Sequence, residues 1–215
     1  MKAKLGLRGR FRVEHLDKDG NLKATYNVPN GIVDVGLNKI LDDMFDGGTQ
    51  SATWYIGLVD NSGFSAFANA DTMASHAGWS ESVAYTEATR PEWTAGTPSS
   101  RSITNASTVD FSINATVTLK GIFIVDNNTK SGTSGTLWST AAFASNVAAV
   151  SGDTLKVTYT VSGYHKSPSR LGLSFGAALV YTLGVSLPCR FYSLKASRLS
   201  ALRSDSLMKP QPVLE

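Results

Sequence analysis

The sequence has one cysteine, Cys189, among its 215 residues. A single cysteine excludes a disulfide within the chain and a zinc site built from several cysteines. A chain of this length buries enough apolar surface to fold without such crosslinks. We therefore expect the fold to depend on a hydrophobic core.

The first fifteen residues, MKAKLGLRGRFRVEH, lack the apolar core that a secretory signal peptide needs. Charged residues interrupt each apolar stretch of this segment. We expect a protein that is not exported and stays in the cytoplasm of the cell that makes it.

An excess of basic residues is also missing from most of the chain. Residues 1–163 contain 13 Lys and Arg against 15 Asp and Glu, a net charge of −2, whereas residues 164–215 carry a net charge of +5. A nucleic-acid surface needs clustered Lys and Arg with aromatic side chains that stack on bases. We therefore expect no nucleic-acid partner for residues 1–163.

The sequence lacks the motifs that define common catalytic and metal sites. It has no G-x-S-x-G turn and no H-x-x-x-H pair, and His15, His76 and His165 are far apart in sequence. Its glycine-rich stretches lack the Lys-Ser/Thr ending of a phosphate-binding loop. We expect a protein that is not an enzyme and that has no catalytic residue, cofactor or metal.

One segment, DKDGN at 17–21, imitates the start of a calcium-binding loop. Its Gly20 is at the fourth position of the loop rather than the sixth, and Val28 stands where the bidentate glutamate belongs. Asp, Asn and Gly in this order are typical of a tight turn between strands. We predict a hairpin turn here.

The dominant pattern of the sequence is the alternation of apolar and polar residues. Such stretches are rich in Val, Ile, Thr, Tyr, Phe and Trp, and turn residues bound them, which is typical of strands. They cover residues 10–15, 23–28, 53–60, 108–113, 116–125, 137–143 and 154–161. The pattern predicts an antiparallel β-sandwich, jelly-roll-like, over residues 1–163.

The segment from Asn30 to Phe45 has a helical period instead. Apolar residues recur there at spacings of three and four, and Gly47 and Gly48 supply a C-terminal stop. The apolar positions are Val33, Leu37, Ile40, Leu41 and Met44. We predict an amphipathic helix after the first hairpin, with this stripe packed on the sheet.

The stretch from Gly63 to Ser100 has weak periodicity and is long for a loop, so it is a candidate contact surface. It contains Trp79, Tyr85, Arg90 and Trp93, which we take as candidates for binding a neighbouring subunit or a glycan.

Two alternatives remain open, the first for carboxylates of this loop and the second for a sugar-stacking platform of Trp54, Trp79, Trp93 and Trp138. Its carboxylates Glu81, Glu87 and Glu92 include the residue type of a glycosidase pair, although loop carboxylates mostly face solvent. Trp54 and Trp138 lie within strand patterns, where a core role is favoured over sugar stacking.

Several stretches together resemble small β-rich structural proteins encoded among the virion genes of tailed bacteriophages. The resemblance covers residues 8–163 and rests on RGRFRVEHLDKDGNLKATYNVPNGIVDVGLNKILDDMF, WYIGLVDNSGF, ADTMASHAGW, KGIFIVDN, GTLWSTAAF and GDTLKVTYTVSG. No catalytic motif defines this family, so the resemblance carries over no site residue.

The resemblance implies a capsid decoration or cement protein, or an accessory tail subunit. Such a subunit is assembled in the host cytoplasm, is located in the virion, binds major capsid or tail proteins and commonly forms homo-oligomers. The alternative is a receptor- or carbohydrate-binding module at a tail tip, in which Trp79, Tyr85 and Trp93 stack on sugar.

Residues 164–215 depart from this pattern. They are basic and contain an uncharged run, 171–187, between Arg170 and Arg190. This run is slightly short of the ~20 residues that span a bilayer, so membrane contact is the less favoured interpretation. The alternatives are a docking arm that becomes ordered on a partner and an unselected extension.

Overall fold

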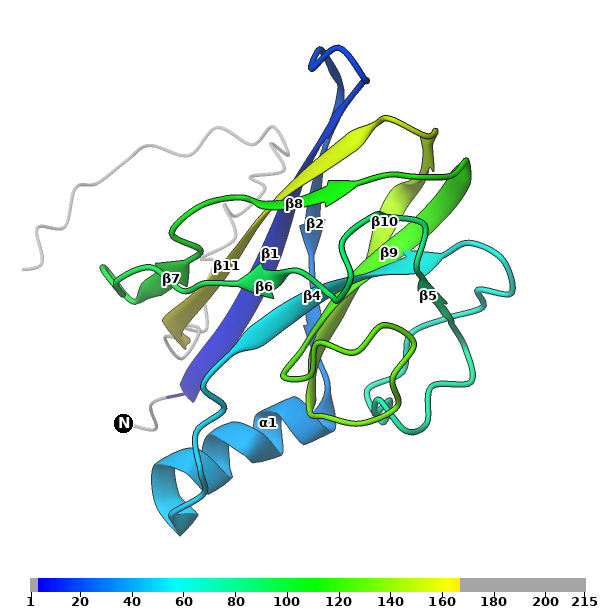
Figure 1. Cartoon of the computed structure of the whole chain (residues 1–215). Helices are drawn as coiled ribbons and strands as arrows, with labels where there is room; N and C mark the ends of the chain where they lie inside the picture. The colour runs from blue at the N-terminus through cyan, green and yellow to red at the C-terminus, as the bar shows by residue number, and fades with distance from the viewer. Residues whose placement is uncertain (1–3, 167–215) are drawn as a thin grey trace, which may run out of the picture. The chain divides into compact units, whose positions relative to one another are not determined.

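The computed structural model describes residues 4–166 of the chain. These residues form two antiparallel sheets and one short helix (Figure 1). The predicted fold class, a mainly β fold of antiparallel sheets with one helix after the first hairpin, is confirmed. The predicted apolar run 171–187 lies outside the described residues.

The first sheet has the strand order β2-β1-β11-β7, and β8 also pairs with β11. Its strands are β1 (Lys4–Leu16), β2 (Leu22–Pro29), β7 (Ser102–Thr104), β8 (Val109–Ser112) and β11 (Thr154–Lys166). β1 and β11 pair in continuous antiparallel register, with Phe11 opposite Tyr159. β11 therefore continues through Gly163, where we predicted the end of the domain, to Lys166.

The second sheet has the strand order β3-β10-β9-β4-β5, and β6 also pairs with β4. Its strands are β3 (Gly31–Ile32), β4 (Trp54–Asp60), β5 (Glu81–Ser82), β6 (Glu92–Trp93), β9 (Val117–Val125) and β10 (Leu137–Ala149). The last five residues of β9 are all buried, so this strand is covered on both faces.

Two hydrophobic clusters account for that double burial. One cluster draws its residues from both sheets, including Phe11 and Val157 of the first sheet and Ile122 of the second. This is the pattern of two sheets packed face to face through alternate residues of their strands. The other cluster covers the opposite face of β9 and β4, where Trp79 packs with Phe123. The long loop after β4 thus forms a second apolar layer on the second sheet.

Tyr159 of β11 joins the two sheets at one point. Its side chain is fully buried and stacks on Phe11 at a centroid distance of 4.3 Å. Trp138 Nε1 of β10 donates a hydrogen bond to the Tyr159 hydroxyl at 2.7 Å, and Asn30 Nδ2 donates another at 3.0 Å. Burial raises the pKa of the Tyr159 hydroxyl to about 12, so it stays neutral and keeps these bonds.

The helix α1 (Asp34–Leu41) continues into a π-helical turn, Asp42–Asp46, which ends at Gly47 in the left-handed conformation. Only the start of this segment touches the sheet: Val33 is buried, and the backbone of Gly36 lies against that of Trp138.

The predicted burial of the helical stripe is wrong. The exposed fractions are 43% for Leu37, 57% for Leu41 and 69% for Met44, and Ile40 is only partly buried. The physical reason is that α1 is attached by its first turn and then extends beyond the edge of the sheet (Figure 1). Periodicity identified an apolar face but carried no information about what covers it.

Leu41→Ala should change the free energy of unfolding by less than about 0.5 kcal/mol, because the side chain is exposed. Gly36→Ala should cost about 1–3 kcal/mol through overpacking, because a Cβ at this position would lie 2.5 Å from the carbonyl oxygen of Trp138. Urea unfolding at low protein concentration measures both. A loss for Leu41→Ala as large as that for Gly36→Ala would show that the stripe is buried within the monomer.

Candidate functional site

The four candidate residues of the 63–100 loop lie in the interior of the protein. Trp79, Tyr85, Arg90 and Trp93 are each at most 8% exposed. The expectation that these side chains are exposed as a contact or sugar-stacking surface is therefore wrong. Their side chains pack the interior of a long loop that has few backbone hydrogen bonds of regular secondary structure to stabilise it.

Trp79 anchors the first part of the loop. Its indole Nε1 donates a hydrogen bond of 2.9 Å to Asp71 Oδ2, and His76 stacks on its ring at a centroid distance of 3.9 Å. On the other side, Trp79 packs against Phe123 of β9 at 5.1 Å. These contacts seal the outer face of the second sheet.

Trp93 and Tyr85 anchor the second part of the loop. Trp93 Nε1 donates a hydrogen bond of 3.1 Å to the backbone oxygen of Tyr159. Tyr85 packs edge to face on Phe111 at 5.0 Å, and the Lys130 ammonium lies 3.8 Å from the centre of its ring. Burial, first of all, raises the pKa of Tyr85, so its hydroxyl is neutral in the folded protein.

Arg90 forms a buried ion pair with Glu81. Arg90 Nε and Nη2 donate to the two carboxylate oxygens at 2.9 and 2.8 Å, a bidentate arrangement. The remaining contacts go to the loop between β9 and β10, where Arg90 donates to the backbone oxygens of Asn127 and Gly132. Arg90 therefore joins two loops and is occupied by these contacts, which assigns it a structural role.

The loop carboxylates have similar roles. Besides Arg90, Glu81 Oε2 accepts a hydrogen bond of 2.7 Å from the backbone N–H of Ser131. Glu87 accepts from the backbone N–H of Ser112 at 3.0 Å. Glu92 is exposed at the start of β6. Two of the three carboxylates considered for a glycosidase pair thus hold neighbouring backbone in place.

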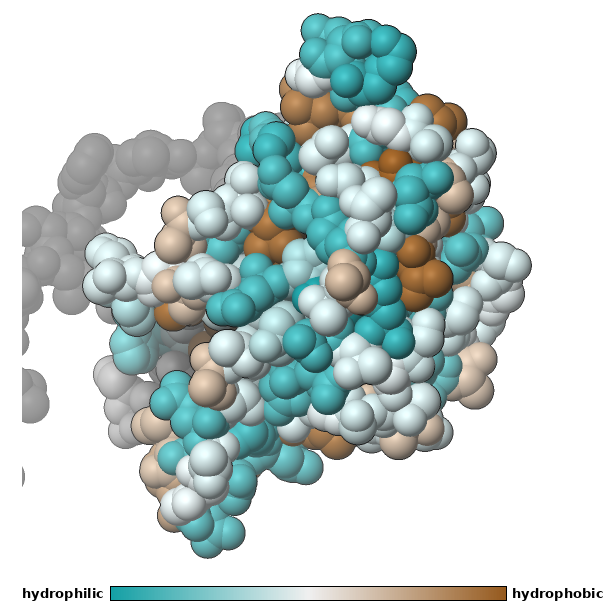
Figure 2. Space-filling model, in the orientation of Figure 1, coloured by the Kyte–Doolittle hydropathy of each residue, from teal (hydrophilic) through white to brown (hydrophobic). Residues whose placement is uncertain are grey.

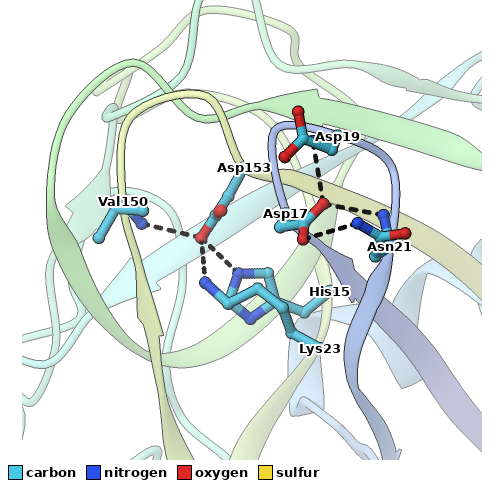
Figure 3. Close-up of polar contacts among 7 residues, drawn as sticks. All are labelled: His15, Asp17, Asp19, Asn21, Lys23, Val150 and Asp153. Carbon is cyan, nitrogen blue, oxygen red and sulfur yellow. Dashed lines mark hydrogen bonds and ion pairs between the residues drawn. The ribbon is translucent and has the colours of Figure 1, made fainter.

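A second polar cluster joins the hairpin of β1 and β2 to the turn between β10 and β11 (Figure 3). Asp153 Oδ2 accepts hydrogen bonds from His15 Nε2 at 2.7 Å, Lys23 Nζ at 2.8 Å and the Val150 backbone N–H at 3.0 Å. Burial alone would raise the pKa of Asp153, but the hydrogen bonds from Lys23, Val150 and His15 outweigh it and lower the pKa to about 2.

The neighbouring DKDGN segment is a hairpin turn, as predicted. Asp17 Oδ1 accepts from the backbone N–H groups of Asp19 and Asn21 at 2.9 and 2.8 Å, and Gly20 has a φ of +82° (Figure 3). The hydrogen bonds from Asn21 chiefly lower the pKa of Asp17. The Asp17 oxygens are thus engaged by the turn itself. Within residues 4–166, no three His, Cys, Asp or Glu side chains are grouped to hold a metal ion.

The exposed apolar residues of the described chain concentrate at the helix. Four of its seven exposed large hydrophobic residues lie between Leu37 and Phe45. The side of the molecule drawn in Figure 2, which includes one side of α1 at the bottom, has its hydrophobic residues in separate spots among hydrophilic ones. A cluster of exposed apolar residues on one helix of a small domain is typical of an interaction surface.

A groove of about 520 Å³ lies beside this helix, and we call it the α1 groove. One wall comes from β1 of the first sheet, with Leu7 and Arg8. The other comes from α1, with Leu37, Ile40 and Leu41. Ile32 of β3 also lines the groove. The α1 groove is therefore apolar at its centre and has a basic residue on one side.

A smaller cavity of about 300 Å³ is lined by residues of both sheets. Three indole side chains line it, those of Trp54, Trp93 and Trp138, together with Tyr159 and Gln50. Trp54 and Trp138 meet edge to face at 6.1 Å and are only half-buried. Trp54 and Trp138 are thus the more exposed indoles of this cavity, and Trp93 is the one candidate of the 63–100 loop that also lines it.

No family model matches the sequence, and no curated protein matches it. Among residues 4–166, no helix has the length and apolar character needed to cross a bilayer.

Sequence reasoning missed both polar clusters. His15 and Asp153 are 138 residues apart. Arg90 and Glu81 were considered separately, as a binding residue and as a glycosidase-type carboxylate, and not as an ion pair. The signal for the α1 groove was present, because the helical stripe was found, but it was interpreted as core.

Arg90→Met should cost about 3–5 kcal/mol of unfolding free energy, because it leaves the Glu81 carboxylate buried without its counter-ion. Arg12→Met is the matched control, since Arg12 pairs with Glu14 at the surface, where such pairs are worth about 0–1 kcal/mol. Equal losses in urea unfolding would contradict the structural role of Arg90.

Asp153 should make folding sensitive to acid. The pKa of Asp153 is lower in the folded protein than its ordinary value of 3.8. Its contribution to the free energy of unfolding is therefore complete above about pH 4 and is lost as the pH falls toward 2. Asp153→Asn should destabilise the protein at pH 7 and flatten the fall in stability between pH 4 and 2. Asp19→Asn, at an exposed position, should leave the pH dependence unchanged. Identical pH profiles of melting temperature for the two variants would exclude this role.

Proposed function

We propose that this protein is a non-enzymatic structural subunit that binds other proteins through the α1 groove. The observation that carries the proposal is the exposed apolar face from Leu37 to Phe45, beside a groove of about 520 Å³. Exposed leucine, methionine and phenylalanine are costly in water, and binding a partner removes that cost.

The arrangement of the rest of the molecule supports a scaffold role. Its two buried polar clusters, at Arg90 and at Asp153, hold loops and turns in place. The polar atoms of both clusters are hydrogen-bonded to other residues of the same chain. The walls of the groove come from β1 and α1, two elements that are separated in the sequence and that the fold brings together. The sheet fixes the β1 wall of the groove, whereas the helical wall is held by the core at its first turn.

We further propose that the assembly is a virion and that the subunit decorates or stabilises a capsid or tail. The support is the resemblance of residues 8–163 to small virion proteins of tailed bacteriophages, together with the two-sheet fold that the resemblance implies. Its partners are then the major capsid or tail proteins.

The second candidate is a receptor- or carbohydrate-binding module. The cavity with Trp54 and Trp138 favours it, because half-buried indole rings offer faces on which a sugar stacks. Quenching of tryptophan fluorescence by millimolar sugar, lost in Trp54→Ala, would support this function over assembly. No quenching across a sugar panel would exclude it.

Leu41→Ser should reduce incorporation of the subunit into particles about tenfold or more, because it removes a central apolar contact of the groove. Leu22→Ser is the matched control, since Leu22 is a 60% exposed leucine on β2, away from the α1 groove. Mass spectrometry of particles purified from cells that carry each variant gives the ratio of subunit to major capsid protein.

Equal incorporation of the two variants would show that the α1 groove is not the binding surface. A wild-type subunit that is absent from purified particles would contradict the virion assignment. Thermal melts of both variants check that each change leaves the fold intact.

A further inference from the structure

The cavity of about 300 Å³ that both sheets line has aromatic walls, and we call it the aromatic cage. Its four rings are those of Trp54, Trp93, Trp138 and Tyr159. Trp54 and Trp138 meet at an angle of 62°, and Trp93 and Tyr159 meet at 69°, so each pair forms a corner rather than a flat stack. None of the described residues that line the cavity is charged.

The polar groups of these walls already have partners within the protein. Trp93 Nε1 donates to the backbone oxygen of Tyr159 at 3.1 Å, and Trp138 Nε1 donates to the Tyr159 hydroxyl at 2.7 Å. Ser51, another lining residue, donates its hydroxyl to Asp126 Oδ2 at 2.8 Å. A ligand rich in hydroxyl or N–H groups would lose hydrogen bonds to water and find few replacements here.

We propose that the aromatic cage binds a small organic cation without N–H groups, of the class of quaternary ammonium compounds such as choline. The face of an aromatic ring carries a negative partial charge and attracts a cation, and the indole ring does so most strongly. The methyl groups around the nitrogen bury apolar surface against the rings, whereas a lysine ammonium is strongly hydrated and needs hydrogen-bond acceptors.

The rings are held in position before any ligand binds. Trp54 of β4 lies opposite Trp93 of β6 in the sheet register, and Tyr159 stacks on Phe11 in the core. Trp138 is held by its hydrogen bond to Tyr159. Rigid walls lower the ordering cost of binding. The cavity is at the lower end of the ~300–1,000 Å³ that is usual for ligand sites, so it suits a cationic head with a short chain.

This inference is independent of the α1 groove, because the two cavities share no lining residue. It uses the cavity of the second candidate function but names another class of ligand. A quaternary ammonium group can come from a soluble molecule or from the headgroup of phosphatidylcholine, and the experiments below separate these two sources.

Saturation-transfer proton NMR of the full chain with choline tests the proposal. The matched probe is dimethylbutanol, in which a carbon atom replaces the charged nitrogen. Choline should bind with a dissociation constant of roughly 1 mM, and dimethylbutanol about tenfold more weakly, because it has the same shape without the charge. Equal binding of the two probes would show that the cavity is only an apolar site and would overturn the proposal.

Two substitutions of one wall isolate the role of the ring. Trp54→Leu keeps an apolar side chain but removes the ring, so it should weaken choline binding about tenfold or more, whereas Trp54→Phe keeps a ring and should weaken it about threefold. Leu41→Ser, in the α1 groove, should leave choline binding unchanged. Equal losses in the two Trp54 variants would contradict the role of the ring. If Trp54→Leu fails to fold in a thermal melt, the comparison of choline with dimethylbutanol on the wild type still decides.

Phosphatidylcholine vesicles distinguish the two sources of the cation. Cosedimentation of the full chain with the vesicles, reversed by free choline, would assign the lipid headgroup as the ligand. Choline binding without cosedimentation would assign a soluble cation. An absence of choline binding would overturn the proposal and leave assembly through the α1 groove standing, and quenching by a sugar in that case would favour the second candidate function.

Discussion

The buried hydroxyl of Tyr159 is the interaction on which the rest of the fold depends. It receives hydrogen bonds from Asn30, at the junction of β2 and β3, and from Trp138 of β10. The backbone oxygen of the same residue accepts the indole N–H of Trp93, which fixes the end of the long loop. One residue of β11 thus ties together both sheets and the loop, and a phenylalanine here would remove the acceptor of two partly buried donors, on Asn30 and Trp138.

The position of α1 follows from that interaction. Trp138 is held by Tyr159 through its side chain, and its backbone oxygen accepts the N–H of Val33 just before the helix. The same backbone leaves room only for a glycine at position 36. The helix is therefore fixed at its first turn by the core, while its later turns project beyond the sheet. The exposure of Leu41 is a consequence of where the core holds the helix.

Local patterns in the sequence were enough to predict the strands, because alternation of apolar and polar residues is visible among adjacent residues, as at 154–161. They failed where the answer depends on distant residues. Periodicity gave the helix containing Leu41 but not the partner of its apolar face, and Trp79 looked like a surface residue because its loop has no period. His15 and Asp153 come together only when β1 pairs with β11, so no local sequence pattern predicts their contact.

The short helix also connects assembly with local order. A helix of eight residues is marginal in water without tertiary contacts, and α1 has few beyond its first turn. Lys39 helps by pairing with Asp43 one turn later and by donating to the backbone oxygen of Thr49 at 2.6 Å. These are partly exposed polar contacts, which stabilise weakly. A partner that covers the apolar face would supply the missing packing, so occupation of the α1 groove should stabilise the helix as well as bury its leucines. If the proposed function holds, binding and helix order are linked, and the α1 groove is most stable when a partner occupies it.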